Sequence, residues 1–268
     1  MFTDSHCHLN FPELRAQLPQ IRQAMAQAQV TRALCICTTM EEFADVHSLA
    51  IEHDNFWSTV GVHPDNEGVR EPLLEELVSL AALPKVVAIG ETGLDYYQMD
   101  SRKGGRSVSD MEWQRDRFRT HIQAARITKL PLVIHTRSAS QDTLDILKEQ
   151  GETGAAGSAG GVFHCFTESQ EVARAALDLG FYISFSGILT FKTAQDLREV
   201  AQFVPEDRLL IETDSPYLAP VPFRGKTNSP AYVPYVAQLL AQLRASTPEH
   251  MAEVTSHNFD QLFSKVNA

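Results

Sequence analysis

Residues 132–151, LVIHTRSASQDTLDILKEQG, contain the unit from which the fold of this chain can be predicted. A short apolar run, Leu132–His135, has the composition of a buried strand and ends on a histidine. A helical pattern, Ser140–Gln150, comes next, and Gly151 is placed to end it. Strand and helix alternate within this one stretch, and the rest of the chain repeats the alternation.

Seven further runs are predicted as strands: Thr3–His8, Arg32–Thr38, Phe56–Val62, Lys85–Glu91, Val162–Phe166, Phe181–Phe185 and Arg208–Asp214. Helical patterns lie between and after them, at Pro12–Val30, Glu41–Asp54, Glu71–Leu83, Met111–Lys129, Glu168–Leu179, Ala194–Phe203, Tyr232–Arg244 and Pro248–Phe263. Strands that alternate with helices predict a parallel sheet, and eight strands close a (β/α)₈ TIM barrel. A doubly wound open sheet is the alternative fold.

The bulk properties fit one domain over residues 1–268, because barrels of this kind need about 250 residues. The chain has no apolar run long enough for a transmembrane helix and does not begin like a signal peptide. We therefore expect a cytoplasmic monomer with no membrane contact and with reduced cysteines. The net charge of −11 argues against broad coating of nucleic acid, but it allows a phosphate substrate held locally by metal ions.

Five of the predicted strands end on side chains that bind metal ions. The residues concerned are His6, His8, Glu91, His135, His164 and Asp214. The C-terminal ends of parallel strands point into the mouth of a barrel, so these side chains are expected to meet there. Each alone has an ordinary structural explanation, such as a satisfied core histidine, but five strand ends together indicate a metal site.

The strand order divides these ligands between two ions. His6 and His8 lie two apart on one strand, and barrel closure brings Asp214 beside them. His135 and His164 end adjacent strands and suit a second ion. Glu91 can bridge the two ions through its two oxygens. We predict two divalent ions per chain; this ligand set suits Zn²⁺, Mn²⁺, Fe²⁺ or Co²⁺, and Mg²⁺ would be held less tightly.

Two other polar residues at strand ends are expected to support the site. His63 ends the strand 56–62, which is flanked by the strands 32–38 and 85–91, so contact with substrate or with a ligand is predicted for it and not a direct bond to metal. Glu212 has the same parity as Asp214 and would lie deeper in the barrel, where a carboxylate needs a partner. A hydrogen bond to a ligand histidine would satisfy Glu212.

Cations and aromatics near the mouth are candidates for substrate binding. Arg137 and Arg224 are placed to hold phosphate oxygens, and Tyr96 could stack on a nucleobase. The loops 98–110 and 219–230 follow strands and would hang over the mouth.

Six motifs, in chain order from residue 4 to residue 218, carry a family resemblance. They are DSHCH (4–8), GVHP (61–64), GETGLDY (90–96), VIHTR (133–137), HCFT (164–167) and IETDSPYL (211–218). Together they resemble the TatD family of metal-dependent deoxyribonucleases. The resemblance implies a TIM-barrel hydrolase with two divalent metals on the six ligands above, and DNA as substrate for a 3′–5′ exonuclease. The segments 98–110 and 151–161 are longer than this resemblance leads us to expect.

The mechanism that we expect is hydrolysis of a phosphodiester by a water molecule that the two metal ions activate. Asp214 would ligate a metal and accept the water proton, Glu91 would bridge, and His63 and Arg137 would stabilise charge on the phosphate. One alternative is a related barrel metallohydrolase acting on a lactone, cyclic amide or phosphoester, which commonly uses a carboxylated lysine as bridge. Another is a non-catalytic binding protein stabilised by metal.

Overall fold

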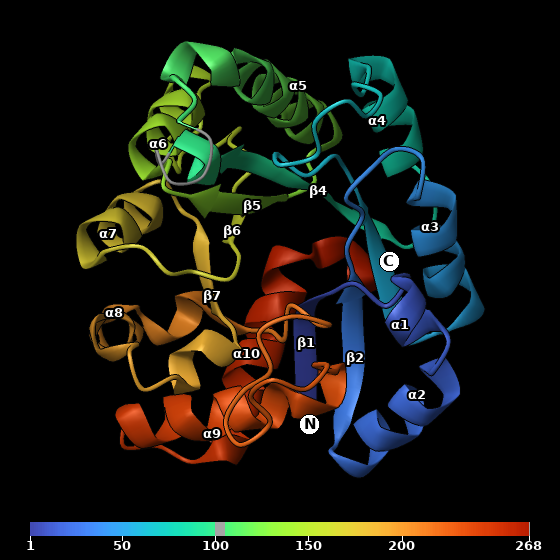
Figure 1. Cartoon of the computed structure of the whole chain (residues 1–268), viewed down its shortest axis with the longest axis vertical. Helices are drawn as coiled ribbons and strands as arrows, with labels where there is room; N and C mark the ends of the chain where they lie inside the picture. Colours follow the sequence, from blue (N-terminus) through green and yellow to red (C-terminus); the bar gives the residue numbers. More distant parts are fainter. Residues whose placement is uncertain (100–104, 268) are drawn as a thin grey trace.

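Eight parallel strands form a barrel in the computed structural model, which describes residues 1–99 and 105–267 (Figure 1). The strands are β1 (Phe2–Cys7), β2 (Val30–Cys35), β3 (Phe56–Val60), β4 (Val86–Asp95), β5 (Leu132–Arg137), β6 (Gly161–Phe163), β7 (Tyr182–Phe185) and β8 (Leu209–Ile211). The α-helices are α1 (Pro12–Arg15), α2 (Leu18–Gln27), α3 (Phe43–Glu52), α4 (Leu74–Ala81), α5 (Glu112–Thr128), α6 (Ser140–Glu149), α7 (Gln170–Asp178), α8 (Gln195–Phe203), α9 (Val233–Leu243) and α10 (Pro248–Leu262). Short 3₁₀ helices are η1 (Tyr97–Met99), η2 (Val108–Met111), η3 (Gly187–Thr190), η4 (Glu206–Arg208), η5 (Pro230–Tyr232) and η6 (Ser264–Asn267).

The order of the strands confirms the TIM barrel and excludes the doubly wound alternative. Neighbours run from β1 to β8 in sequence order, and the pairs are parallel, whereas a doubly wound sheet reverses its order at a switch point. The two ends of the sheet meet after β8. There, the amide of Asp214 donates to the carbonyl of His6 (2.9 Å), and the amide of His8 donates to the carbonyl of Ser215 (2.8 Å).

Apolar side chains fill the barrel interior, and α10 closes its N-terminal end. The inner cluster contains residues from β2, β3, β4, β5, β6 and β8 together with Phe259 of α10 and Phe263, which directly follows that helix. This helix, red in Figure 1, lies across the barrel near β1. A larger apolar cluster fills the layer between the strands and the outer helices. The polar side chains that could form a functional site therefore lie at the C-terminal end of the barrel.

Several boundaries differ from those predicted from sequence, for local reasons. The helix expected at Pro12–Val30 is two helices, α1 and α2, because Pro19 in a continuous helix would clash with the preceding turn. Strand β4 continues to Asp95, which pairs with Arg137 of β5. Strands β6 and β8 end before His164 and Asp214, and the backbone then turns with φ of 43° at Cys165 and 55° at Asp214.

The segment 151–161 precedes β6, as the sequence indicated, and so lies at the end of the barrel opposite the ligands. The segment folds around the buried carboxylate of Glu152. This carboxylate accepts hydrogen bonds from Arg126 (3.1 Å) and from the amides of Ala159 (3.1 Å) and Gly160 (3.0 Å). Among the described residues, no helix has the length and apolar character needed to cross a membrane.

Candidate metal centre

His6 and His8 lie at the end of β1, where the barrel closes. Their Nε2 atoms are 3.3 Å apart, and Asp214 Oδ1 lies 3.6 Å from the first and 3.3 Å from the second. These three ligand atoms form one compact group that a single cation can occupy. The contact between the first and last strands that the sequence predicts is therefore present.

His135 and His164 continue two inward-facing rows of the inner core. Val133 precedes His135 by two residues and Val162 precedes His164 by two, so each histidine points the same way as an apolar residue of the barrel interior. His135 Nδ1 lies 3.3 Å and His164 Nε2 lies 2.8 Å from Glu91 Oε1. The same face of each strand therefore supplies a packed apolar residue and, two residues later, a candidate metal ligand.

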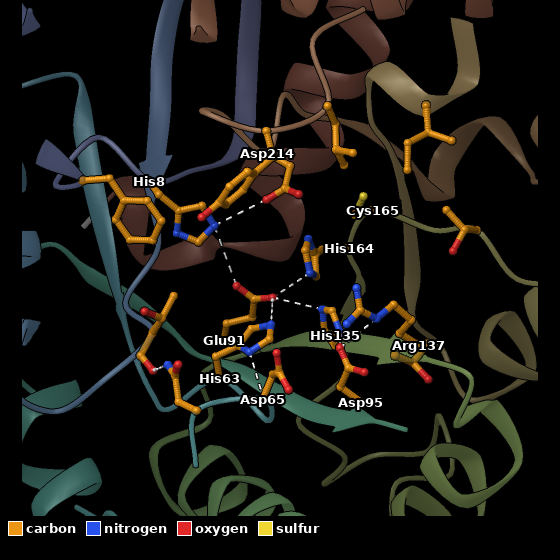
Figure 2. A pocket seen from close by; sticks show the side chains of 18 residues that line it. His8, His63, Asp65, Glu91, Asp95, His135, Arg137, His164, Cys165 and Asp214 are labelled. Carbon is orange, nitrogen blue, oxygen red and sulfur yellow. Dashed lines mark hydrogen bonds and ion pairs between the residues drawn. The ribbon is translucent and has the colours of Figure 1, made fainter. Parts of the chain in front are cut away.

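Glu91 lies between these two groups, and each of its oxygens faces a different one (Figure 2). Oε2 is 3.3 Å from His6 Nε2 and 3.9 Å from His8 Nε2. Oε1 faces the histidines of β5 and β6 and also His63 Nε2, at 3.3 Å. A carboxylate in this position can bridge two cations.

The glycines on either side of Glu91 allow β4 to approach β5 closely. Gly90 has φ of 151°, and a Cβ there would lie 2.7 Å from the carbonyl oxygen of Val133. Gly93 has φ of 126°, and a Cβ would lie 2.0 Å from the carbonyl oxygen of His135. Larger residues would push the two strands apart and move Glu91 away from the histidines.

Two buried carboxylates contact His135 and His164, each at the ring nitrogen that faces away from Glu91. Glu212 Oε1 lies 3.2 Å from His164 Nδ1, as the sequence predicted, and Asp95 Oδ2 lies 3.0 Å from His135 Nε2. An imidazole that donates from one nitrogen presents the lone pair of the other, here toward Glu91. Sequence reasoning missed Asp95, although its two-residue period from Glu91 along β4 was a usable signal.

The carboxylates at the centre are held in their ionised form. Burial raises the pKa of Glu91, but the imidazoles of His164, His63 and His6 outweigh it and hold that pKa well below its ordinary value. Burial likewise opposes ionisation of Asp214, and its hydrogen bond to His8 lowers its pKa below the ordinary value. Ionised carboxylates therefore face buried histidines.

One buried nitrogen of the centre is suited to bind a cation. His164 Nε2 is buried and has no hydrogen-bond partner, although Glu91 Oε1 is only 2.8 Å away, because the angles do not suit a hydrogen bond. A metal ion bound by both atoms would satisfy this nitrogen. The donor set of imidazoles and carboxylates is the one that divalent transition metals prefer.

His63 lies closer to the centre than its strand position suggested. Its Nδ1 accepts the amide hydrogen of Asp65 (3.0 Å), so the neutral ring carries its hydrogen on Nε2, which points at Glu91 Oε1 (3.3 Å). A nitrogen that carries hydrogen donates hydrogen bonds and does not ligate metal. Burial lowers the pKa of His63, which favours this neutral form.

Two residues of α5 hold the backbone on both sides of His63, and the sequence gave no signal for them. His121 Nε2 accepts the amide hydrogen of Val62 (3.0 Å), and burial lowers its pKa to about 4, so it remains neutral. Arg117 donates to the carbonyls of His63 (2.9 Å) and Asn66 (2.9 Å). The helix thereby fixes the segment that presents His63.

The expected substrate-binding residues have different fates. Arg137 lines the cavity of the centre, with Nε 2.9 Å from Asp95 Oδ2 and its guanidinium 4.1 Å from the ring centre of Tyr97. Arg224 is exposed and lines a neighbouring hollow, not the cavity itself.

Tyr96 requires a correction, because the structure places it outside the cavity. It is 5% exposed, and its hydroxyl donates to Asp142 (2.8 Å) and accepts from Arg115 (2.9 Å). Its ring is therefore packed under α5 and α6 and cannot stack on a base.

The cavity has a volume of about 540 Å³ and is lined by His8, His63, Glu91, His135, His164 and Asp214 among others. Loop 98–110 contacts its rim, since Gln98 Nε2 donates to Asp65 Oδ1 (3.3 Å), a residue that also lines the cavity. Residues 100–104 of this loop lie outside the described residues. No lysine lines the cavity within the described residues, and Lys85 Nζ donates to three backbone carbonyls near β3 instead. The bridge of carboxylated lysine that the lactone-type alternative requires has no counterpart in this cavity.

A TIM barrel that gathers imidazoles and carboxylates around one central glutamate at its C-terminal mouth is typical of a metal-dependent hydrolase. Comparison with known proteins gives the family. The family model described as TatD related DNase matches residues 3–264, and the chain belongs to this family.

The relatives agree over nearly the whole chain. A metal-dependent hydrolase of Escherichia coli K12 named YcfH is 46% identical over 264 residues, which cover 97% of this chain and 94% of that protein. The 3′-5′ ssDNA/RNA exonuclease TatD of Salmonella typhimurium is 34% identical, covering 89% and 90%. The crystal structure of the Escherichia coli TatD homologue YJJV superposes with a TM-score of 0.86 at 29% identity, covering 98% of each chain.

Proposed function

We propose that this hydrolase cleaves phosphodiester bonds of DNA from the 3′ end, using two divalent metal ions. The observation that carries the proposal is the position of Glu91, whose two oxygens face two separate groups of histidines. A single ion would need three or four of these ligands, whereas two ions account for all of them. The Salmonella relative, named as an exonuclease on ssDNA and RNA, supports a nucleic acid as the substrate.

The distances between the six candidate ligands sort them into two groups, one for each ion. His6, His8 and Asp214 would hold one ion, His135 and His164 would hold the other, and Glu91 would be shared between them, because its two oxygens face the two groups. When bound, such a pair polarises the phosphate and lowers the pKa of a water molecule.

The residues of the chain then supply the proton transfer and the charge stabilisation. Asp214 lines the cavity and its pKa lies below the ordinary value, so it is ionised and can accept a proton from the attacking water. His63 donates from Nε2 to a phosphate oxygen. Arg137, oriented by Asp95, holds another phosphate oxygen from the cavity wall.

Replacement of the bridge tests the metal assignment. Glu91→Gln keeps the size of the side chain but removes its charge, and we expect turnover to fall about a thousandfold or more. Metal content measured by mass spectrometry should fall from two ions per chain, while circular dichroism shows an intact fold. Glu75→Gln is the matched control, because Glu75 is an exposed carboxylate on α4. Activity near that of the wild type in Glu91→Gln would refute the bridge.

The substrate is tested separately with metal-free protein. End-labelled single- and double-stranded DNA and RNA are digested after addition of Mg²⁺, Mn²⁺ or Zn²⁺, and the products are separated by length. We expect a ladder that shortens from the 3′ end of DNA, and none without metal. Cleavage at internal positions, or of RNA alone, would contradict the exonuclease on DNA. Thermal unfolding that depends on metal, with no cleavage of any substrate, would favour a metal-stabilised binding protein.

A further inference from the structure

A second hollow adjoins the cavity of the metal centre, under the loop that follows β8. Its volume is about 470 Å³, and it shares the lining residues Tyr217 and Leu218 with the cavity. Arg224 and Lys226 supply cations on its wall, and Glu13 supplies a carboxylate. We name this hollow the β8-loop pocket.

The two cations of the β8-loop pocket lie against aromatic rings. Within the part of the chain that the structure describes, neither Arg224 nor Lys226 forms an ion pair. The guanidinium of Arg224 lies 3.5 Å from the ring centre of Phe191, and Lys226 Nζ lies 5.7 Å from that of Phe223. In a chain of net charge −11, unpaired cations in a hollow beside the metal centre are available to an anion. An arginine that stacks on an aromatic ring can still donate hydrogen bonds from its N–H groups to phosphate oxygens.

The loop that forms the pocket is held in place by hydrogen bonds. Asn228 Nδ2 donates to the carbonyls of Thr213 (2.8 Å) and Tyr217 (2.6 Å), and the amide of Val221 donates to Thr190 Oγ1 (2.9 Å). The first of these bonds links the loop to the residue before Asp214. The position of the pocket relative to the metal centre is therefore fixed by the fold.

Tyr217 stands between the two spaces with 54% of its surface exposed. Its ring makes an edge contact with Phe11, with 6.3 Å between ring centres, and Phe11 in turn stacks on His8 at 4.8 Å. An exposed aromatic ring that is supported in this way is suited to stack on a base of single-stranded nucleic acid.

We propose that the β8-loop pocket binds the phosphate next to the scissile one, on the strand that remains after cleavage. The base between these two phosphates then lies against Tyr217. Arg224 and Lys226 are exposed, so the strand can continue past them into solvent. This inference rests on the proposed nuclease function. It implies that the protein binds at least two consecutive phosphates of the substrate strand. Glu13 also lines the pocket, and its carboxylate repels the strand and so favours a position of the phosphate beside the cations.

Two substrates separate the pocket from the centre. Thymidine 5′-p-nitrophenyl phosphate has one phosphodiester and no neighbouring phosphate, whereas d(TTT) has both. In the variant Arg224→Ala with Lys226→Ala, the ratio of kcat/KM for d(TTT) to kcat/KM for the chromogenic substrate should fall about tenfold, mainly through KM. Glu13→Gln should move the same ratio in the opposite direction. A double variant of two exposed cations elsewhere, Arg22→Ala with Lys148→Ala, is the control of equal charge.

A neutral linkage locates the phosphate. A methylphosphonate at the first linkage of d(TTT) should cost the wild type the same factor as the double substitution, and it should cost the double variant nothing further. The slope of log KM against log salt should also fall by about one in the double variant. A double variant that treats both substrates as the wild type does, or a methylphosphonate that costs the wild type nothing, would refute the pocket.

Binding in an inactive background keeps the two proposals distinguishable. In Glu91→Gln, fluorescence anisotropy of labelled d(TTT) should show about tenfold weaker binding when Arg224 and Lys226 are also replaced. Unchanged binding refutes the pocket, whether or not the wild type cleaves. If the wild type cleaves neither substrate with any metal, the nuclease function fails on its own.

Discussion

The two ends of the barrel are built from the same strands but differ in polarity and in packing. At the N-terminal end, Trp57, Phe259 and Phe263 belong to an apolar cluster that α10 closes. At the C-terminal end, carboxylates and imidazoles meet around Glu91, and a buried nitrogen of His164 has no hydrogen-bond partner. One end is filled by apolar packing, and the other presents polar groups to a cavity.

The change from one end to the other takes two residues along a strand. Val133 belongs to the packed interior and His135 to the metal centre, and Val162 and His164 repeat the step on the next strand. The packed layer fixes the directions of the strands, and through them the directions of the ligands. Stability and reactivity are therefore separable by position, which mutations can test.

The largest expected effect is on stability at the packed end. Phe259→Ala empties a fully buried site on α10, and we expect the free energy of unfolding to fall by about 3–5 kcal/mol in denaturant titration. Turnover at a temperature where the variant is folded should stay within about twofold of the wild type, because Phe259 does not line the cavity.

Ile127→Ala on α5 serves as the control for this change, because Ile127 is 58% exposed and its loss should alter stability by at most about 0.5 kcal/mol. A Phe259→Ala protein that is folded but has lost its metal would show that the two ends are coupled, contrary to the comparison.

A smaller effect is expected at the reactive end, behind the ligands. Asp95→Asn weakens the acceptor that orients His135 and Arg137, and we expect metal affinity or kcat/KM to fall about 10- to 100-fold. Metal titration of the purified variant measures the first quantity directly. Asp142→Asn is the matched control, because Asp142 accepts from Tyr96 and Arg115 outside the cavity. Equal metal affinity in Asp95→Asn and the wild type would exclude the orienting role.

The barrel could be predicted because its strands and helices are short and strongly patterned. Runs such as Leu132–His135 and Phe181–Phe185 have few alternatives, and their alternation with helices leaves little choice of topology. The ends of individual strands could be predicted less well where tertiary contacts determine them. β4 continues to Asp95 only because β5 continues beside it, and β6 ends at Phe163 because Cys165 turns with positive φ.

The candidate site could be predicted as far as strand ends define it. His6, His8, Glu91, His135, His164 and Asp214 meet where parallel strands must bring them. The supporting residues on helices could not be predicted in this way, because a helix is joined to the site by packing and not by register. His121 and Arg117 look like ordinary helix residues until α5 is placed against the segment of His63. Tyr96 shows the converse error, since proximity in sequence to Glu91 said nothing about the direction of its ring.

The smallest expected effect concerns Tyr96. It distinguishes a base-stacking role, which the sequence suggested, from the packing role that the structure shows. Tyr96→Phe removes hydrogen bonds to Asp142 and Arg115, which remain paired with each other, so we expect a loss of about 1 kcal/mol in the free energy of unfolding. Tyr96→Leu also removes the ring, and KM for d(TTT) should still stay within about twofold of the wild type. Tyr217→Leu, which removes the exposed ring beside the cavity, should raise that KM instead. If Tyr96→Leu raised KM and Tyr217→Leu did not, the base would stack on Tyr96 and the strand would leave the centre on the side of Arg137.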